Sequence, residues 1–546
     1  MQGQLGDDMK RREFLAAAAL TASGSWSIRT LGQPCPPPSV SISGGTATRA
    51  SCNSGSKSGP AWFNRIDPLK WTSIAGGPGM SESWQSGDRL AEAVPPGPYF
   101  GNWGPRYLTA GWNGACVDPE NREMIIALNG GHAAWQYNDA YALDLGSDVP
   151  SWRRIVDATP EVDPTDGTRY YDAWNNDTLS PGPDRYLDPV VDQDGMAYAR
   201  PLLVPGWLGD GPQPQIRYSD RSPDLSRVLR RPRTVHTCSH YHYSNGRVWY
   251  PILNAWNQGS GRTSLVKLAL DLDLLRKSPV LKSWRYGSPG PWRYIGAITE
   301  QTGGDTDTFG FGVAALDSST GRIWYTGQRT SSYWSMETLG TAAGKHTYYD
   351  DAPRDKPLSS SAGAIAYGLP QADGSTTSLF VLMEVGTFRL WVLDTSKAGS
   401  GTAWSVVTPV NASRFEWAAG LKAVEPSHSG HPAAYGMVYH ASSRCFLAYN
   451  CDQLPSRSVV RKLSVPLRAD GTYDSKGNWV WSEIVLGGEP PAVNNPSARN
   501  IGGGGGSYTR FNIFPDFAGT GEALLVHLSH FNQPTSVCKL PPGMVT

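Results

Sequence analysis

The chain has 546 residues, and its 48 Lys and Arg balance its 48 Asp and Glu, so the formal net charge is zero. A neutral balance argues against a nucleic-acid-binding protein, which needs a cationic surface to hold phosphates. The 61 Gly and 43 Pro predict many turns, and the 21 Trp and 24 Tyr are typical of short β-strands joined by loops.

The N-terminal residues have the order of an export signal. The motif Lys10-Arg11-Arg12-Glu13-Phe14 precedes an apolar run over 16–20, which resembles a twin-arginine signal peptide. The run is much shorter than the roughly 20 apolar residues that a membrane-spanning helix needs. We therefore expect residues 1–30 to be removed on export, which predicts a periplasmic or secreted protein with no membrane partner after signal removal.

The rest of the chain divides by composition. Residues 31–60 are rich in Pro, Ser and Gly, so we expect a linker there. Residues 61–546 carry one repeating pattern and predict a single domain.

Seven cysteines become relevant if the protein reaches an oxidising compartment, where disulfides form. The pairs closest in sequence, Cys35 with Cys52 and Cys445 with Cys451, are the expected bridges. Because the count is odd, at least one thiol stays free.

An apolar or aromatic strand followed by a short polar turn and a second strand recurs along the chain, which is a hairpin signal. The turns begin near residues 118, 244, 317, 371, 441 and 515. Third strands often follow, and a fourth strand then carries a tryptophan. The predicted fourth strands begin at Trp152, Trp284, Trp404 and Trp481.

Four strands per unit, repeated six or seven times, predict an all-β fold, a β-propeller. A further hairpin around 192–195 is the candidate for a seventh unit. The last unit lacks its tryptophan strand, and residues 71–74 supply one. We therefore expect an N-terminal strand to close the ring and remove both sheet edges.

The segment Gly130-Gly131-His132, followed by 137–145, resembles a kelch repeat, with its diglycine, spaced aromatic residue and third strand ending in Asp. The resemblance implies a kelch-like propeller, similar to the central domain of galactose oxidase. In that arrangement, the loops leading into the innermost strands and those leaving the second strands build one mouth of the ring.

Several histidines, tyrosines and arginines fall in those loops. The residues predicted to be catalytic are His132, His236, Tyr241, Arg233 and Arg510. The residues predicted to bind substrate are His428, His431, His530, Tyr137 and Tyr508. The cofactor stays open, with a divalent metal at this histidine-rich mouth as one possibility.

Histidine transfers protons near neutral pH, and arginine neutralises a carboxylate. This set suits removal of a proton beside a carboxylate, and some exported propellers are lyases of this kind. The favoured interpretation is a polysaccharide lyase that performs β-elimination on a glycan containing uronic acid.

Two alternatives remain open at this point. One is a non-catalytic propeller that binds glycans or proteins, because fold does not determine function. The other is a copper-radical oxidase resembling galactose oxidase. That family has an adjacent Tyr-His pair of ligands, which Tyr439-His440 resembles. Cys238 or Cys116 is the candidate for the thiol that the family crosslinks to a tyrosine.

Overall fold

The computed structural model separates Met1–Gly55 from Ser56–Thr546 as two units. All described residues belong to the second unit. They are residues 59–74, 89–94, 108–109, 113–129, 139–158, 190–191, 197–198, 237, 241–255, 264–283, 290–298, 312–327, 331–353, 362–384, 387–412, 435–451, 457–492 and 507–543. The predicted signal peptide and most of the predicted linker lie outside them, and N-terminal sequencing of the exported protein would test the cleavage.

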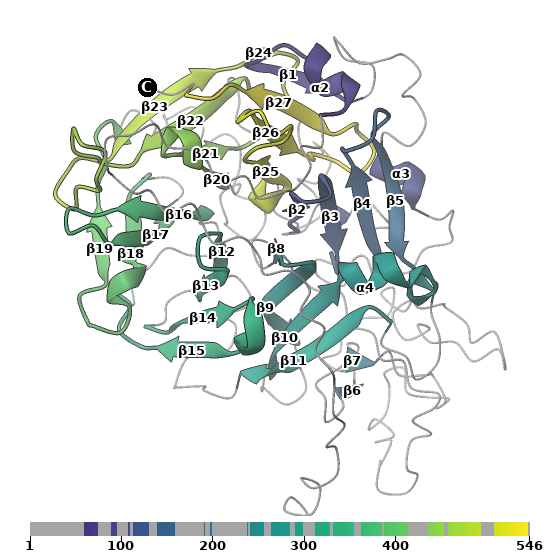
Figure 1. Ribbon diagram of the computed structural model, residues 1–546, viewed down its shortest axis with the longest axis horizontal. Coiled ribbons are helices and arrows are strands. Elements are labelled where there is room, and N and C mark those ends of the chain that lie inside the picture. The colour runs from purple at the N-terminus through teal and green to yellow at the C-terminus, as the bar shows by residue number, and fades with distance from the viewer. Residues whose placement is uncertain are drawn as a thin grey trace, which may run out of the picture. The chain divides into compact units, whose positions relative to one another are not determined.

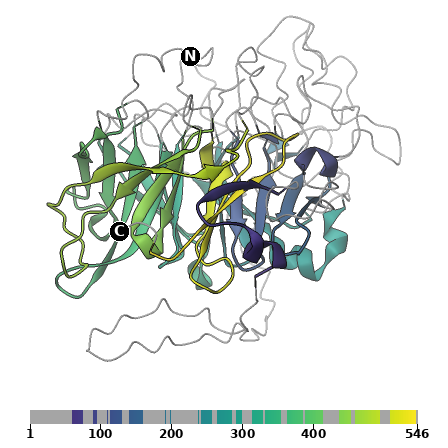
Figure 2. The same cartoon turned by 90° about the horizontal axis from the view of Figure 1, so that it is seen from above.

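In the described part of the chain, six sheets of at least four strands surround a common centre, and each is one blade of a β-propeller (Figure 1). In every blade, the first four strands counted from the centre pair antiparallel with their neighbours. Figure 2 shows the blades from the side, with strands running between the two faces of the ring. The predicted all-β propeller is confirmed, and the number of blades is six.

The strand bounds follow the predicted hairpins. Blade 1 contains β2 (Cys116–Asp118), β3 (Glu123–Ala127), β4 (Ala140–Asp144) and β5 (Ser151–Val156). Blade 2 contains β8 (His242–Ser244), β9 (Arg247–Ala255), β10 (Ser264–Asp271) and β11 (Trp292–Ile298). Blade 3 contains β12 (Val313–Asp317), β13 (Arg322–Thr326), β14 (Tyr333–Glu337) and β15 (His346–Tyr349).

The second half of the ring repeats this order. Blade 4 contains β16 (Ala362–Pro370), β17 (Thr376–Met383), β18 (Leu390–Asp394) and β19 (Trp404–Val407). Blade 5 contains β20 (Gly436–His440), β21 (Cys445–Tyr449), β22 (Val459–Ser464) and β23 (Val480–Val485). Blade 6 contains β25 (Phe511–Phe514), β26 (Ala523–His527), β27 (Ser536–Leu540) and β1 (Lys70–Ser73), with β24 (Gly487–Gly488) at its outer edge. Short helices are α2 (Ala61–Arg65), α3 (Leu90–Ala93) and α4 (Leu272–Lys277).

Aspartates at strand ends set the turns. The Asp118 carboxylate accepts hydrogen bonds from the amides of Glu120 and Asn121, each at 3.0 Å. Asp317 accepts one from the amide of Ser319 at 2.9 Å. These Asx turns reverse the chain within a few residues, and this local chemistry explains why the hairpins were predictable from sequence.

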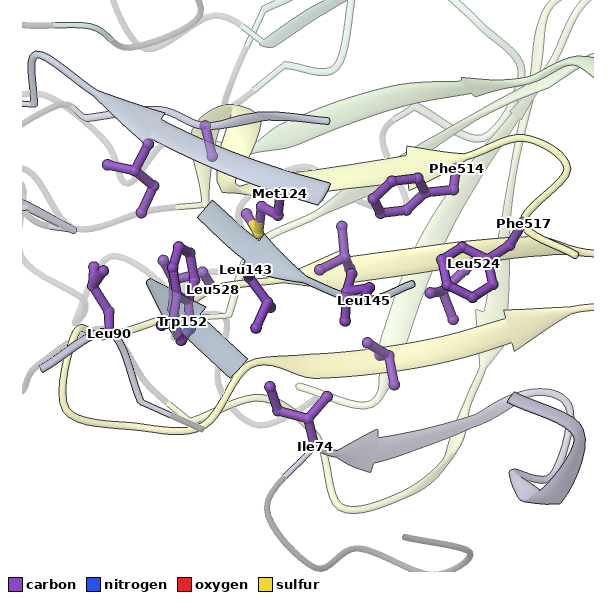
Figure 3. Packing of buried hydrophobic residues seen from close by; sticks show 14 of the residues in the cluster. Ile74, Leu90, Met124, Leu143, Leu145, Trp152, Phe514, Phe517, Leu524 and Leu528 are labelled. Atoms are coloured by element: carbon purple, nitrogen blue, oxygen red, sulfur yellow. The ribbon is translucent and has the colours of Figure 1, made fainter. Parts of the chain in front are cut away.

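Successive strand residues point to opposite faces of a blade, so each blade contributes to two hydrophobic seams. Met124 and Ile126 pack toward blade 6, whereas Ile125 and Ala127 pack toward blade 2. Figure 3 shows the seam between blades 6 and 1, where side chains including those of Leu143, Trp152, Phe514 and Leu524 meet. Comparable clusters fill the seams between the other neighbouring blades.

The N-terminal strand β1 closes the ring, as predicted (Figure 1). It pairs antiparallel with β27, with Trp71 opposite Cys538. On its other side β1 pairs with β24, where Gly488 has a φ of 74° and a Cβ would collide with the carbonyl oxygen of Trp71. Glycine is therefore required at position 488 for β24 to pack this closely against β1.

Charged side chains join blades 1 and 2 at the hairpin end of the ring. The Arg276 guanidinium on α4 reaches Asp118 Oδ2 at 2.5 Å and Glu123 Oε2 at 2.7 Å, and Arg153 also pairs with Glu123. Burial alone would lower the pKa of Arg276, but the two carboxylates outweigh it and raise that pKa. The helix inserted after β10 thus fastens two blades together.

That insertion also makes one strand prediction wrong. The outer strand of blade 2 is β11, which begins at Trp292 and not at the predicted position, and Trp284 itself lies outside the described residues. Because α4 and a 3-10 turn over Pro279–Lys282 follow β10 directly, the fourth strand begins later than in the other blades. The hairpin near 192–195 likewise adds no blade, since β6 (Val190–Val191) and β7 (Ala197–Tyr198) pair only with each other in the described residues.

The predicted bridge between Cys445 and Cys451 is wrong, because both are buried free thiols. Cys445 opens β21, and Cys451 lies just beyond the end of that strand. An extended strand rises about 3.3 Å per residue, whereas disulfide-linked Cα atoms lie no more than about 7 Å apart. Although Cys445 and Cys451 are close in sequence, the extended strand between them keeps their thiols apart in space. Cys35, Cys52 and Cys238 lie outside the described residues.

Within the described ranges, no helix combines the length and the apolar character needed to cross a bilayer.

Candidate functional site

The candidate site lies where blades 6, 1 and 2 meet, at the end of the ring opposite the inner hairpins. We call this region the mouth face. It consists of segments that lead into the innermost strands or leave the second strands, namely 113–115, 129, 237, 241, 507–510 and 527–530. Segments almost 400 residues apart in the chain touch here, since Thr509 Oγ1 accepts the amide hydrogen of Ala115 at 3.1 Å.

A hydrogen-bond network centred on the backbone of Gly114 joins blades 1 and 2. Thr237 Oγ1 accepts the Gly114 amide hydrogen at 3.1 Å. The Gly114 carbonyl accepts hydrogen bonds from Asn129 Nδ2 at 2.8 Å and from the Tyr241 hydroxyl at 2.6 Å. Thr237 also bonds to Asn129 Oδ1, and Asn129 Nδ2 reaches the carbonyl of Leu108 at 2.8 Å. Three loops are thereby held against one another.

Tyr241 is a fully buried member of this network. Its ring stacks on Tyr250, with ring centroids 5.0 Å apart. Burial, reinforced by the nearby Cys116 thiol, raises the pKa of Tyr241 well above its ordinary value. The phenol therefore keeps its proton at neutral pH and donates it in a hydrogen bond.

Arg510 places a positive charge inside the mouth face. Its side chain is only 1% exposed, and Nη1 donates to the carbonyl of Ser529 at 3.3 Å. The charge acts on both Tyr241 and His527, lowering the proton affinity of each. Since little water screens it, this guanidinium contributes strongly to the local potential.

His527 ends the second strand of blade 6 and is fully buried. Its Nε2 lies 2.9 Å from Ser507 Oγ, which also accepts the amide hydrogen of Cys451 at 3.1 Å. The ring packs edge-on against Tyr449. Burial, together with the Arg510 charge, lowers the pKa of His527 well below its ordinary value, so the imidazole is neutral at physiological pH.

Two further residues predicted as site residues lie on the mouth face. Tyr508 is buried and has a φ of 44°, in the left-handed region that non-glycine residues rarely adopt. His530 is half-buried, and its Nδ1 accepts the amide hydrogen of Asn532 at 3.2 Å. The structure thus brings Tyr241, Tyr508, Arg510 and His530 to one end of the ring.

The remaining predicted site residues are not among those that the structure describes. They are His132, His236, Arg233, His428, His431 and Tyr137. Among the described residues, no group of three or more His, Cys, Asp or Glu side chains is arranged to hold a metal ion.

Sequence reasoning missed the polar side chains that connect the mouth face. The missed residues are buried and lie in or near the segments that flank apolar strands, namely Asn129, Thr237, Ser507, Thr509 and His527. His527 stands at a strand end, which is a signal that the sequence offers, but that signal does not reveal the partner.

The ligand pair suggested for a copper-radical oxidase lies elsewhere. Tyr439 and His440 end β20 at its hairpin turn, opposite the mouth face, and His440 Nε2 lies 3.1 Å from Ser442 Oγ. Cys116 and Tyr241 lie toward the other end of the inner strands. Tyr439 and His440 therefore do not share a site with Cys116, while the other candidate thiol, Cys238, lies outside the described residues.

No family model and no curated protein matches the chain. Among solved structures, the chain is similar to the periplasmic gluconolactonase PpgL of Pseudomonas aeruginosa, at 11% identity over 70% of this chain and 86% of that one, with a TM-score of 0.28. It is also similar to an oligogalacturonate lyase in complex with manganese, at 10% identity over 80% and 91% of the two chains, with a TM-score of 0.29. For the GH74 enzyme of Niastella koreensis the identity is 12% over 70% and 39%, with a TM-score of 0.26. Likenesses this weak determine neither substrate nor reaction, so the site residues carry the functional argument.

Proposed function

We propose that this protein acts on carbohydrate, as a lyase that cleaves a uronic-acid-containing polysaccharide by β-elimination at the mouth face. The observation that carries the proposal is the buried Arg510 guanidinium, whose charge reaches Tyr241 on blade 2 and His527 on blade 6. A fixed positive charge in a poorly hydrated place attracts an anionic group, and the carboxylate of a uronic acid is such a group.

In β-elimination, a base removes the proton from the carbon that bears the carboxylate. That C–H electron pair forms a carbon–carbon double bond, the glycosidic C–O bond breaks, and the leaving oxygen takes up a proton. The positive potential of Arg510 would stabilise the negative charge that develops on the carboxylate in the transition state.

The proton transfers are assigned to His132 and His236, because imidazole exchanges protons near neutral pH. We also propose that five further residues contact the sugar rings, namely His428, His431, His530, Tyr137 and Tyr508. A divalent metal beside these histidines remains compatible with the proposal, and metal analysis of the purified protein tests it.

The experiment offers the purified protein a panel of uronate polysaccharides and follows the ultraviolet absorbance of the unsaturated product. An Arg510→Met variant should lose about 10²-fold or more in turnover, because the group that stabilises the developing charge is gone. Arg510→Lys should retain part of the activity, since it keeps the positive charge.

The matched control is Arg461→Met, which removes another buried guanidinium, on β22, where it pairs with Glu483 at 3.3 Å. This variant should lose stability without a comparable loss of turnover. If the wild-type protein produces no absorbance with any polymer, or if both variants lose turnover equally, the lyase proposal is wrong.

A further inference from the structure

Arg510 is the last residue of a short turn that two neighbouring blades hold in place. The turn is the 3-10 segment Tyr508–Arg510, which leads directly into β25. Together with Ser507 we call it the anchored turn. The Arg510 amide donates to the Ser507 carbonyl at 3.0 Å, and all four residues of the turn are buried.

Two hydroxyl groups tie the anchored turn to the blades on either side of its own. Ser507 Oγ accepts the amide hydrogen of Cys451, which follows β21 of blade 5, at 3.1 Å. Thr509 Oγ1 accepts the amide hydrogen of Ala115, which precedes β2 of blade 1, also at 3.1 Å. Cys451 and Ala115 are fully buried, so water does not replace either hydrogen bond if it is lost.

The backbone of the anchored turn is strained and tightly enclosed. Tyr508 has a φ of 44°, a conformation that costs free energy in a residue other than glycine and persists only where surrounding contacts hold it. On the side of blade 5, a Cβ at Gly436 would collide with the Tyr508 carbonyl oxygen, so glycine is required for β20 to approach the turn this closely. The turn therefore has little freedom to move.

The backbone and the side chain of Arg510 are both bonded to the segment that follows β26. The Arg510 carbonyl accepts the amide hydrogen of Leu528 at 3.1 Å, and Nη1 donates to the Ser529 carbonyl at 3.3 Å. Because a buried charge is little screened and its field weakens with distance, the effect of Arg510 on a bound anion depends on where the turn holds it. A displacement of about 1 Å in a catalytic site can cost on the order of 10²-fold in rate.

We propose that Thr509 is a positioning residue, which fixes the Arg510 guanidinium on the mouth face by fastening the anchored turn to blade 1. This inference rests on the proposed function for the reaction that Arg510 serves. Thr509 does not need to touch the substrate, because it acts through the next residue in the chain.

The test compares Thr509→Val with Thr509→Ser. Valine has nearly the shape of threonine but cannot accept the hydrogen bond from Ala115, whereas serine keeps the hydroxyl. Thr377→Val is the matched control, because it removes another buried threonine hydroxyl, which donates to Asp394 Oδ1 at 2.6 Å in blade 4.

The first readout is amide hydrogen exchange, which needs no substrate. In Thr509→Val, the Ala115 amide should exchange about fivefold faster or more, the factor expected from the loss of one hydrogen bond. The Leu528 amide should also exchange faster, because it is bonded to the Arg510 carbonyl at the end of the turn that has been released. Thr509→Ser and Thr377→Val should leave both amides near the wild-type rate.

The second readout is turnover of the uronate polymer that the wild-type protein cleaves fastest. Thr509→Val should lower kcat by about tenfold or more with little change in KM, and Thr509→Ser should restore it. Combined with Arg510→Met, the Thr509→Val change should cause no further loss, because the group that it positions is already gone. If Thr509 had a merely structural role, the two losses would multiply.

Unchanged exchange at Ala115 in Thr509→Val would overturn the anchor, and faster exchange at Ala115 without a change at Leu528 would overturn its hold on Arg510. Both results apply whether or not the protein is a lyase. An unchanged kcat in Thr509→Val, or losses that multiply in the double variant, would overturn the positioning role in the reaction. If the wild-type protein cleaves no polymer, the proposed function fails, while exchange at Leu528 still decides whether Thr509 fixes Arg510.

Discussion

His440 shows how the surroundings of one side chain couple stability to pH. It ends β20, is 1% exposed, and burial lowers its pKa from 6.5 to about 4. An unfolded chain would return this imidazole to water and to its ordinary pKa. Between these two values the unfolded state therefore binds more protons than the folded state.

The free energy of unfolding should consequently fall as the pH drops from 6.5 toward 4. Above pH 6.5, His440 should contribute no pH dependence to the free energy of unfolding. Across that pH window, the free energy of unfolding of a His440→Gln variant should fall by on the order of 2 kcal/mol less than that of the wild type. The reason is that a full unit of pKa shift corresponds to about 1.4 kcal/mol. Urea unfolding followed by tryptophan fluorescence at several pH values measures the difference.

Equal slopes for wild type and His440→Gln would show that His440 does not hold a lowered pKa in the folded protein.

At the scale of elements, the critical strand is β1, because it joins the N-terminal part of the chain to the C-terminal strand β27. A propeller blade with a missing outer strand exposes unpaired backbone groups, which is unfavourable and invites aggregation. In this protein β1 removes that edge by pairing with β27, and Trp71 inserts its side chain into the seam between blades 5 and 6.

Trp71→Ala should therefore destabilise the domain by about 3–5 kcal/mol, because it leaves a large cavity in the seam and weakens the closure of the ring. Trp404→Ala is the comparison, since that residue has the same place in blade 4 but is only half-buried. Chemical denaturation of the two variants measures the difference. A cost for Trp71→Ala no larger than that for Trp404→Ala would argue against a closing role for β1.

Elements also show where pattern reasoning succeeds and where it fails. Turns at Asp118 and Asp317 were predictable, because the aspartate side chain and the amides that it bonds lie within three residues of one another. The outer strand of blade 2 was predicted at Trp284, whereas β11 begins at Trp292. The pattern gave no sign that α4 and a 3-10 turn would follow β10 and delay the next strand.

At the scale of the whole molecule, the seams between blades make the cysteines inert. In the described part of the chain, the buried free thiols are Cys116, Cys445, Cys451 and Cys538. Burial raises the pKa of each of the first two, that of Cys445 to about 12. A thiol that stays protonated and covered is a poor nucleophile, so these cysteines should neither react nor form bridges in the folded protein.

Iodoacetamide should accordingly leave these four thiols unmodified in the native protein and alkylate all four after unfolding without any reductant. The tryptic peptide 445–457 contains both Cys445 and Cys451, and its mass should show two added groups. A peptide that takes up the reagent only after reduction would reveal a bridge and contradict the strand geometry.

For the mouth face, residue types were predictable but partnerships were not. Arg510 and Tyr241 follow from their places beside innermost strands, whereas Asn129 and Thr237 carry no distinguishing pattern of their own. Their importance depends on Gly114, which a search of local sequence has no reason to single out.

The amino-acid sequence by itself determined the strands, the turns and the closure of the propeller by its N-terminal strand. Alternating apolar residues and turn-forming aspartates act over a few positions, so their effect can be read along the chain. Tertiary structure alone decided the number of blades, the free state of Cys445 and Cys451 and the hydrogen bonds around Gly114. These features depend on which distant segments touch, and contacts such as that between Thr509 and Ala115 exist only once the ring has closed.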